Sequence, residues 1–169
     1  MDRKFFLTKG IIYLEGQLGK SEAVEIIGIL SKLDQRHIDV IKIYVALEDA
    51  DFSASLMLVD VIKSLKTPVK TYAISYLGGY SSYIFLPGNE RVALKHSVIN
   101  FPRFDLAIFG SKNELINFNH FREKIKNNLK NTYTNLTGQD VFEEFLIEDR
   151  FMKSEEMLRR NIATEIIGG

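Results

Sequence analysis

The chain has 169 residues, 46% of them hydrophobic and 26% charged, which is enough for one domain with a buried core. Lysine plus arginine and aspartate plus glutamate number 22 each, so the overall charge favours neither nucleic-acid nor membrane partners. No apolar run reaches the roughly 18 residues of a membrane span, and Lys9, Gly10 and Glu15 interrupt any signal-peptide core. The absence of cysteine excludes disulfides, thiolate metal sites and cysteine catalysis, and it fits a cytoplasmic location.

The first half of the chain alternates between predicted strands and helices. Residues 10–18, 41–47 and 69–74 are mostly apolar, as in buried strands of a parallel sheet. Apolar residues recur every three or four positions over residues 23–33 and 54–65, which indicates helices. Ser21 can cap the first helix, and Asp51 or Ser53 can cap the second. Alternating strands and helices predict an α/β fold of βαβ units with right-handed crossovers.

A glycine corner follows the third predicted strand and is the feature that bears most on function. Gly78-Gly79 lie between this strand and a short predicted helix, Ser81–Phe85. Such a pair lets the backbone approach a ligand or an anion closely at the helix N-terminus. Many hydrolases carry a nucleophile at this kind of corner, whereas here the position is glycine. Two short strand-like runs follow between Arg91 and Phe101.

The last third of the chain is dominated by one long predicted helix. Ser111 and Glu114 form a capping box, and apolar residues recur at helical spacing up to Thr137-Gly138. About 25 helical residues span about 37 Å, which exceeds what a domain of this size needs to cover its own sheet. A surface helix packed on the core is one interpretation. We prefer a helix that partly projects and meets another subunit. Without repeats or linkers, residues 1–169 are predicted to form a single domain.

Three stretches in order carry a family resemblance. Residues 136–139 (LTGQ) and 148–156 (EDRFMKSEE) resemble "TGQ … RDxFMSAEEA" with the same separation. Residues 10–18 (GIIYLEGQL) are similar to "RIIFLGGPI", and residues 91–94 with Ser97 are similar to "KRFALPNSRV". Together they resemble the Clp protease proteolytic subunit, ClpP, over essentially the whole chain. The resemblance implies a crotonase-like α/β superhelix whose subunits form heptameric rings, stacked through the long helix at about residues 110–137.

The same resemblance assigns the catalytic positions. The nucleophilic serine of "QAASMGA" aligns with Gly79, and the histidine of "RVMIHQP" aligns with Pro102, or with Phe101 after a one-residue gap. Asp149 alone is retained from the triad. Next to Arg150, and without an imidazole partner, it is expected to hold subunits together through an ion pair. The "SPGG" loop that helps to bind the oxyanion corresponds to residues 47–50.

These replacements predict a subunit that no longer cuts. Asp49, Ala50 and Tyr80 occupy the oxyanion-hole positions, and a carboxylate there opposes the negative charge of the oxyanion. Glycine at position 79 has no side chain with which to start acyl transfer. We therefore expect a degenerate, ClpR-type subunit that forms rings, alone or with an active ClpP paralogue. It would act structurally or as a regulator in ATP-dependent proteolysis.

Docking of the AAA+ unfoldase is expected to be weak. Lys42 and Tyr44 correspond to two tyrosines that line the family's docking pocket, so one aromatic ring is replaced by a charge. The chain also begins at the family's first helix, without the segment that forms the axial-pore loops in ClpP. Both observations argue against direct gating by an unfoldase.

Two other functions stay open. A displaced triad would need Ser81 or Ser82 within hydrogen-bond reach of a histidine such as His96; a hydrolase with an unrecognised mechanism ranks last. Alternatively, the vacated corner could bind a peptide or an acyl chain, on a scaffold that also serves acyl-thioester enzymes. The tyrosines that would surround such a cleft are Tyr72, Tyr76, Tyr80 and Tyr83. His37 and His120 are expected in solvent without metal-ligand spacing, so neither metal nor cofactor is predicted.

Overall fold

The computed structural model describes residues 5–6, 9–36, 38–102, 111–138 and 151–168. Its main sheet has the strand order β1-β2-β3-β4-β6-β9, and a second, three-stranded sheet has the order β5-β7-β8. The main-sheet strands are Phe5–Phe6, Ile11–Leu18, Ile41–Ala50, Val69–Ala73, Glu90–Leu94 and Glu165–Ile167 in that order. The strands of the second sheet are Tyr76–Leu77, Val98–Asn100 and Phe151–Lys153. From β2 to β9 the main sheet is parallel, as predicted.

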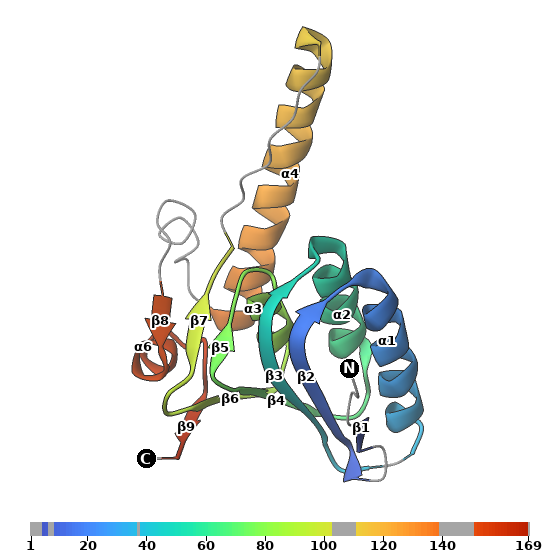
Figure 1. Ribbon diagram of the computed structural model, residues 1–169, viewed down its shortest axis with the longest axis vertical. Coiled ribbons are helices and arrows are strands. Elements are labelled where there is room, and N and C mark those ends of the chain that lie inside the picture. Colours follow the sequence, from blue (N-terminus) through green and yellow to red (C-terminus); the bar gives the residue numbers. More distant parts are fainter. Residues whose placement is uncertain (1–4, 7–8, 37, 103–110, 139–150, 169) are drawn as a thin grey trace.

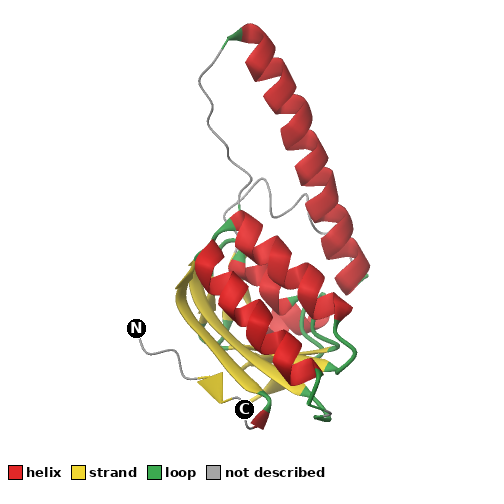
Figure 2. Ribbon diagram, turned by 90° about the vertical axis from the view of Figure 1, so that its right-hand side faces the viewer, coloured by secondary structure: helices red, strands yellow, loops and turns green. Residues whose placement is uncertain are grey.

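Two long helices pack side by side over one face of the main sheet, and another long helix leaves the body (Figure 2). The bounds are α1 Lys20–Asp34, α2 Phe52–Ser64, α3 Ser81–Phe85, α4 Lys112–Thr137 and α6 Ser154–Arg159. Figure 2 shows α1 and α2 side by side over the sheet, while α4 projects from the body in both ribbon views (Figures 1 and 2). The expected α/β architecture with a long projecting helix is thus present. No helix in the described part of the chain is long and apolar enough to cross a membrane.

Alternation in the strands explains why this sheet is covered on one side. In β3, Ile41, Ile43, Val45 and Leu47 are buried against the helices, and the residues between them are partly exposed. The apolar stripe of α1, which includes Ile26, Leu30 and Leu33, fills the other side of that core. Because strand side chains alternate between the two faces of a sheet, every second residue of the strand is buried in this core.

Three element boundaries differ from or refine the sequence prediction. The strand predicted over residues 41–47 continues to Ala50, because it pairs with β2 as far as Leu18. Helix α1 begins at Lys20 rather than after a Ser21 cap, since Glu22 accepts a hydrogen bond from the N–H of Gly19 at 3.0 Å. Of the two candidate caps of α2, Asp51 rather than Ser53 is the cap, and it accepts a hydrogen bond from the N–H of Ala54 at 2.9 Å.

Helix α4 has the predicted capping box and a glycine at its other end. Its 26 residues span about 39 Å at about 1.5 Å per residue. Only residues near its C-terminal end, Leu129, Tyr133 and Thr137, are buried. In the projecting half, Leu115 is 38% exposed and Phe121 is 55% exposed. Contact of this half with another subunit stays a prediction.

A buried arginine ties the foot of α4 to the sheet. Arg91 of β6 donates hydrogen bonds to the carbonyl oxygens of Ile162 (2.8 Å), Asn161 (3.0 Å) and Gly88 (3.3 Å). Burial lowers the pKa of its guanidinium. The side-chain amide of Asn161 in turn donates to the carbonyl of Thr137, the last residue of α4. Asn161 therefore links the two: its backbone carbonyl accepts from Arg91, and its side chain donates to the last residue of the projecting helix.

Ser75, between β4 and β5, has a left-handed backbone with φ of 58°. That conformation costs a non-glycine residue roughly 1–2 kcal/mol. We expect Ser75→Gly to raise the free energy of unfolding by up to about 1 kcal/mol, since glycine's greater freedom in the unfolded chain offsets part of the gain. The melting temperature should rise by about 2–4 °C. Ser75→Ala is the control, because alanine keeps the strain; an equal rise there would contradict the explanation.

Candidate functional site

The glycine corner sits where the carboxyl end of β3 meets the turn between β5 and α3. The N–H of Gly78 donates to the carbonyl oxygen of Leu47 at 3.0 Å, which holds the turn against β3. A Cβ atom on Gly78 would overlap the carbonyl oxygen of Glu48 and lie 2.9 Å from the hydroxyl of Tyr76. Gly79 is left-handed with φ of +55°. Both glycines are therefore required by close backbone approach or by conformation.

Asp49 faces this corner because β3 contains a bulge. Gly16 of β2 lies opposite Leu47, whereas Gln17 lies opposite Asp49, so Glu48 is an extra residue in the pairing. Asp49 accepts a hydrogen bond from the N–H of its neighbour Ala50 at 2.8 Å. A Cβ atom on Gly79 would lie only 2.6 Å from Asp49 Oδ1. The segment that aligns with an oxyanion loop is thus strand, with a carboxylate over the glycine.

The serines after the corner have their hydroxyls turned into the protein. Ser81 donates to the carbonyl oxygens of Gly78 (2.6 Å) and Leu47 (3.0 Å), and Ser82 donates to that of Gly79 (2.8 Å). Both serines are fully buried. These hydroxyls hold the start of α3, and neither donates to an imidazole within the described residues. The geometry gives a displaced triad no support.

The positions aligned with the family's histidine hold apolar side chains in the structure. Phe101 is buried and meets Tyr83 and Tyr133 edge-on, with ring centroids 6.4 and 5.3 Å apart. Pro102 is half-buried. Of the described histidines, His96 is exposed in the turn between β6 and β7, and His120 is exposed on α4. Asp149, Arg150 and His37 lie outside the described residues.

The four tyrosines predicted to surround a vacated cleft do not gather around the corner. Tyr76 lies against Gly78, and Tyr80 packs edge-on against Phe52 with centroids 5.1 Å apart. Tyr83 is buried beneath the corner, where burial raises the pKa of its hydroxyl. Tyr72 belongs to a ring stack on the far face of the main sheet. Tyr72 and Tyr83 are thus packing residues, and the structure gives no support to a cleft lined by all four tyrosines.

This stack of tyrosine rings was not predicted from the sequence. One of its members, Tyr44, is a predicted docking residue. Tyr13, Tyr44 and Tyr72 are directly opposite one another on β2, β3 and β4. Their rings stack with centroid separations of 4.7 and 4.3 Å. Burial, followed by the neighbouring tyrosines, raises the pKa of Tyr44. Lys42, two residues before Tyr44, lies beside Lys70 in the sheet, and the ammonium of Lys70 lies 5.8 Å from the ring centroid of Tyr72.

The chain's relationship to known proteins agrees with this arrangement. Residues 2–169 match the sequence model of the family described as Clp protease. The chain belongs to the Clp protease family. No curated protein matched it. The mixed parallel sheet and the long α4 are consistent with the ClpP-like fold, and members of the family typically form ring oligomers.

The described parts of the chain contain no candidate metal centre. No group of three or more histidine, aspartate or glutamate side chains is placed to hold a metal ion within those residues. A small cavity of about 180 Å³ lies beside the corner, lined by Gln17, Leu18, Gly19, Asp49, Ala50 and Asp51. Its carboxylates already accept hydrogen bonds from backbone N–H groups, Asp49 from Ala50 at the end of β3 and Asp51 from Ala54 at the start of α2.

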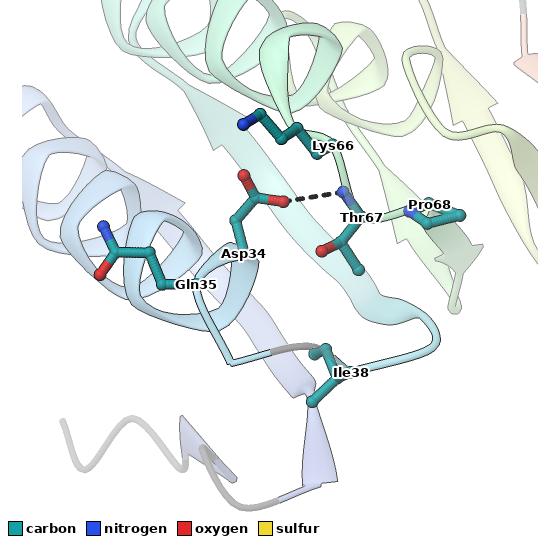
Figure 3. A pocket seen from close by; sticks show the side chains of 6 residues that line it. All are labelled: Asp34, Gln35, Ile38, Lys66, Thr67 and Pro68. Carbon is teal, nitrogen blue, oxygen red and sulfur yellow. Dashed lines mark hydrogen bonds between the residues drawn. The ribbon is translucent and has the colours of Figure 1, made fainter.

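A larger surface cavity of about 580 Å³ lies at the other end of the sheet, between the end of α1 and the loop after α2. Figure 3 shows its six lining residues, including Asp34, which accepts a hydrogen bond from the N–H of Thr67 at 2.7 Å. That bond, followed by the Thr67 side chain, lowers the pKa of Asp34. The cavity is open to solvent. The hydrogen bond between Asp34 and Thr67 beside it joins the end of α1 to the loop after α2.

The Asp34 contact predicts a pH dependence of stability. A carboxyl whose pKa is lowered by folding stabilises the fold above its unfolded pKa of about 4, and this contribution is lost as the pH falls through the folded pKa. We expect Asp34→Asn to lower the melting temperature at pH 7, and the difference from the parent to shrink below about pH 4. Thermal unfolding between pH 7 and pH 3 measures this. Asp39→Asn is the control; a constant Asp34→Asn difference would contradict the assignment.

Proposed function

We propose that this protein is a catalytically inactive ClpP-like subunit that assembles into rings and acts structurally or as a regulator in ATP-dependent proteolysis. The observation that carries the proposal is the glycine corner itself. Gly79 stands where the alignment places the nucleophile, and it offers no hydroxyl. The hydroxyls of the serines that follow it, Ser81 and Ser82, are buried and donate to backbone carbonyls.

The lack of a general base supports the same proposal. Serine acyl transfer needs an imidazole to take the nucleophile's proton. Phe101 and Pro102 have no group that binds a proton, and Phe101 is part of a buried aromatic cluster. The retention of Asp149 in the sequence does not replace the base, because in a triad the carboxylate only orients and stabilises the imidazole.

Helix α4 supports self-association into a heptamer or double ring. In its projecting half, Leu115 and Phe121 are exposed, and Phe118 lies between them on the same side of the helix. Exposed apolar residues that share one face mark interaction surfaces. A second subunit of the same family, either another copy or an active ClpP paralogue, is the partner that we propose. Docking of an unfoldase is proposed to be weak, because Lys42 places a charge beside Tyr44.

A fluorophosphonate probe and a fluorogenic peptide test the lack of catalysis, with an active ClpP assayed in parallel as the positive control. We expect neither labelling nor hydrolysis by the purified chain. Labelling that disappears in Ser81→Ala or Ser82→Ala would replace this proposal with a displaced triad. Native mass spectrometry of the chain, alone and mixed with a ClpP from the same genome, tests assembly; a monomer under both conditions would refute the ring.

A further inference from the structure

We propose that Asp49 closes the glycine corner, so that the carbonyl group of a peptide or an acyl ligand cannot bind there. This inference rests on the proposed function and deepens it. In that proposal the corner lacks a nucleophile; here the space that a nucleophile and its substrate would share is already filled. The corner would then be closed to non-covalent peptide and acyl ligands as well as to catalysis.

The bulge in β3 is what aims Asp49 at the corner. In a regular strand, successive side chains point to opposite faces. Here Leu47 and Ala50 are buried while the two residues between them are exposed, because Glu48 is the extra residue opposite β2. A bulge of this kind re-aims one side chain and changes the local twist. It also brings the carbonyl oxygen of Glu48 against the Cα of Gly78.

The carboxylate is held in place over Gly79. Asp49 Oδ1 accepts the N–H of Ala50 at 2.8 Å, and the same oxygen would lie 2.6 Å from a Cβ atom on Gly79. Real Cβ atoms essentially never come within 3.0 Å of another atom. On the adjacent residue, Gly78, the carbonyl of Glu48 and the ring of Tyr76 fill the corresponding space. With Asp49 in this position, neither glycine leaves room for the Cβ atom of an L side chain.

The negative charge of Asp49 opposes the binding of a carbonyl group at the corner, as its steric overlap does. A bound carbonyl carries a partial negative charge on its oxygen, and sites that bind it supply hydrogen-bond donors. Asp49 supplies an acceptor instead. Within the described part of the chain no lysine or arginine forms an ion pair with it. Its negative charge therefore adds to the steric exclusion of a carbonyl.

A double-mutant cycle between Asp49 and Gly79 tests the contact, with urea unfolding as the readout. Gly79→Ala should lower the urea midpoint in the parent, and Asp49→Ala should remove at least about half of that loss. Asp49→Asn, which keeps the size of the side chain, should leave the loss nearly complete. The strain of alanine at a φ of +55° is common to all three backgrounds and cancels. Equal losses with Asp49 and with Asp49→Ala would overturn the proposal, and so would failure of Gly79→Ala to fold in both.

Thiol labelling tests whether the corner is closed to a small reagent. The chain has no cysteine, so Gly79→Cys introduces a single thiol. Its reaction with iodoacetamide, compared at pH values where the thiolate rate is constant, should be about tenfold faster or more in the Asp49→Ala background. Ser75→Cys, at an exposed position, is the control and should react equally in both backgrounds. Equal rates for Gly79→Cys would overturn the closure.

The two proposals fail separately. Fluorophosphonate labelling of the unmodified chain would end the claim of inactivity without changing the cycle between Asp49 and Gly79. Equal Gly79→Ala losses would end the claim of closure even if the chain is never labelled.

Discussion

Phe101→Ala is expected to lower the free energy of unfolding by about 3–5 kcal/mol, the range for removing a buried phenylalanine. Phe101 is 3% exposed, and its ring contacts Tyr83 from α3 and Tyr133 from α4 edge-on. Its removal leaves a cavity between the corner helix and the base of the projecting helix. Urea unfolding measures the loss. Phe151→Ala is the matched control, because Phe151 is 59% exposed, and it should change stability by less than about 0.5 kcal/mol.

Phe101→His extends this prediction to function. A histidine at this position would bury a polar ring among aromatic side chains, which costs stability unless it finds hydrogen-bond partners. We therefore expect Phe101→His to destabilise the protein without restoring hydrolysis, even when combined with Gly79→Ser. Phe101, which the resemblance places at the catalytic base, packs between Tyr83 of α3 and Tyr133 of α4. A stable double variant that cleaves the fluorogenic peptide would contradict this assignment.

Local signals explain which parts of the fold could be predicted from the sequence. The capping box of Ser111 and Glu114 and the cap at Asp51 depend on residues three apart, and both are present as predicted. The short helix Ser81–Phe85 follows directly from the glycine pair, and its bounds agree. The mostly apolar run of residues 41–47 identified a strand of the parallel sheet. Each of these features is set by interactions within a few residues of the chain.

Features that depend on register between distant segments could not be predicted. The bulge at Glu48 is defined by the pairing of β3 with β2, some thirty residues earlier. Residues 47–50 were therefore predicted as a loop, whereas the strand continues through them. The stack of Tyr13, Tyr44 and Tyr72 likewise requires three strands in one register. For the site, the absence of a hydroxyl at Gly79 could be read directly, whereas the position of Asp49 over it could not.

Phe121→Glu on α4 is expected to disrupt self-association while the subunit stays folded. Phe121 is 55% exposed, and Leu129 is the first residue of α4, counting from its N-terminus, that is buried. Burying a phenylalanine at an interface contributes about 1.5–3 kcal/mol, so the substitution should weaken each α4 contact by about 2 kcal/mol, or roughly 30-fold in affinity. Because a ring repeats the contact in every subunit, the effect multiplies across the assembly. Native mass spectrometry should show a smaller species than the parent.

A control on the same helix separates lost packing from added charge. Asn127 is exposed and lies nine residues after Phe118, on the opposite side of a helix with 3.6 residues per turn. Asn127→Glu adds the same charge on the side opposite the apolar stripe of Phe118, Phe121, Ile125 and Leu129, which recur every three or four residues, so it should leave the assembly intact. Circular dichroism should show equal helix content in both variants, because the first half of α4 makes few contacts with the protein body. If Phe121→Glu and Asn127→Glu have the same effect on assembly, the apolar stripe of α4 is not the contact surface.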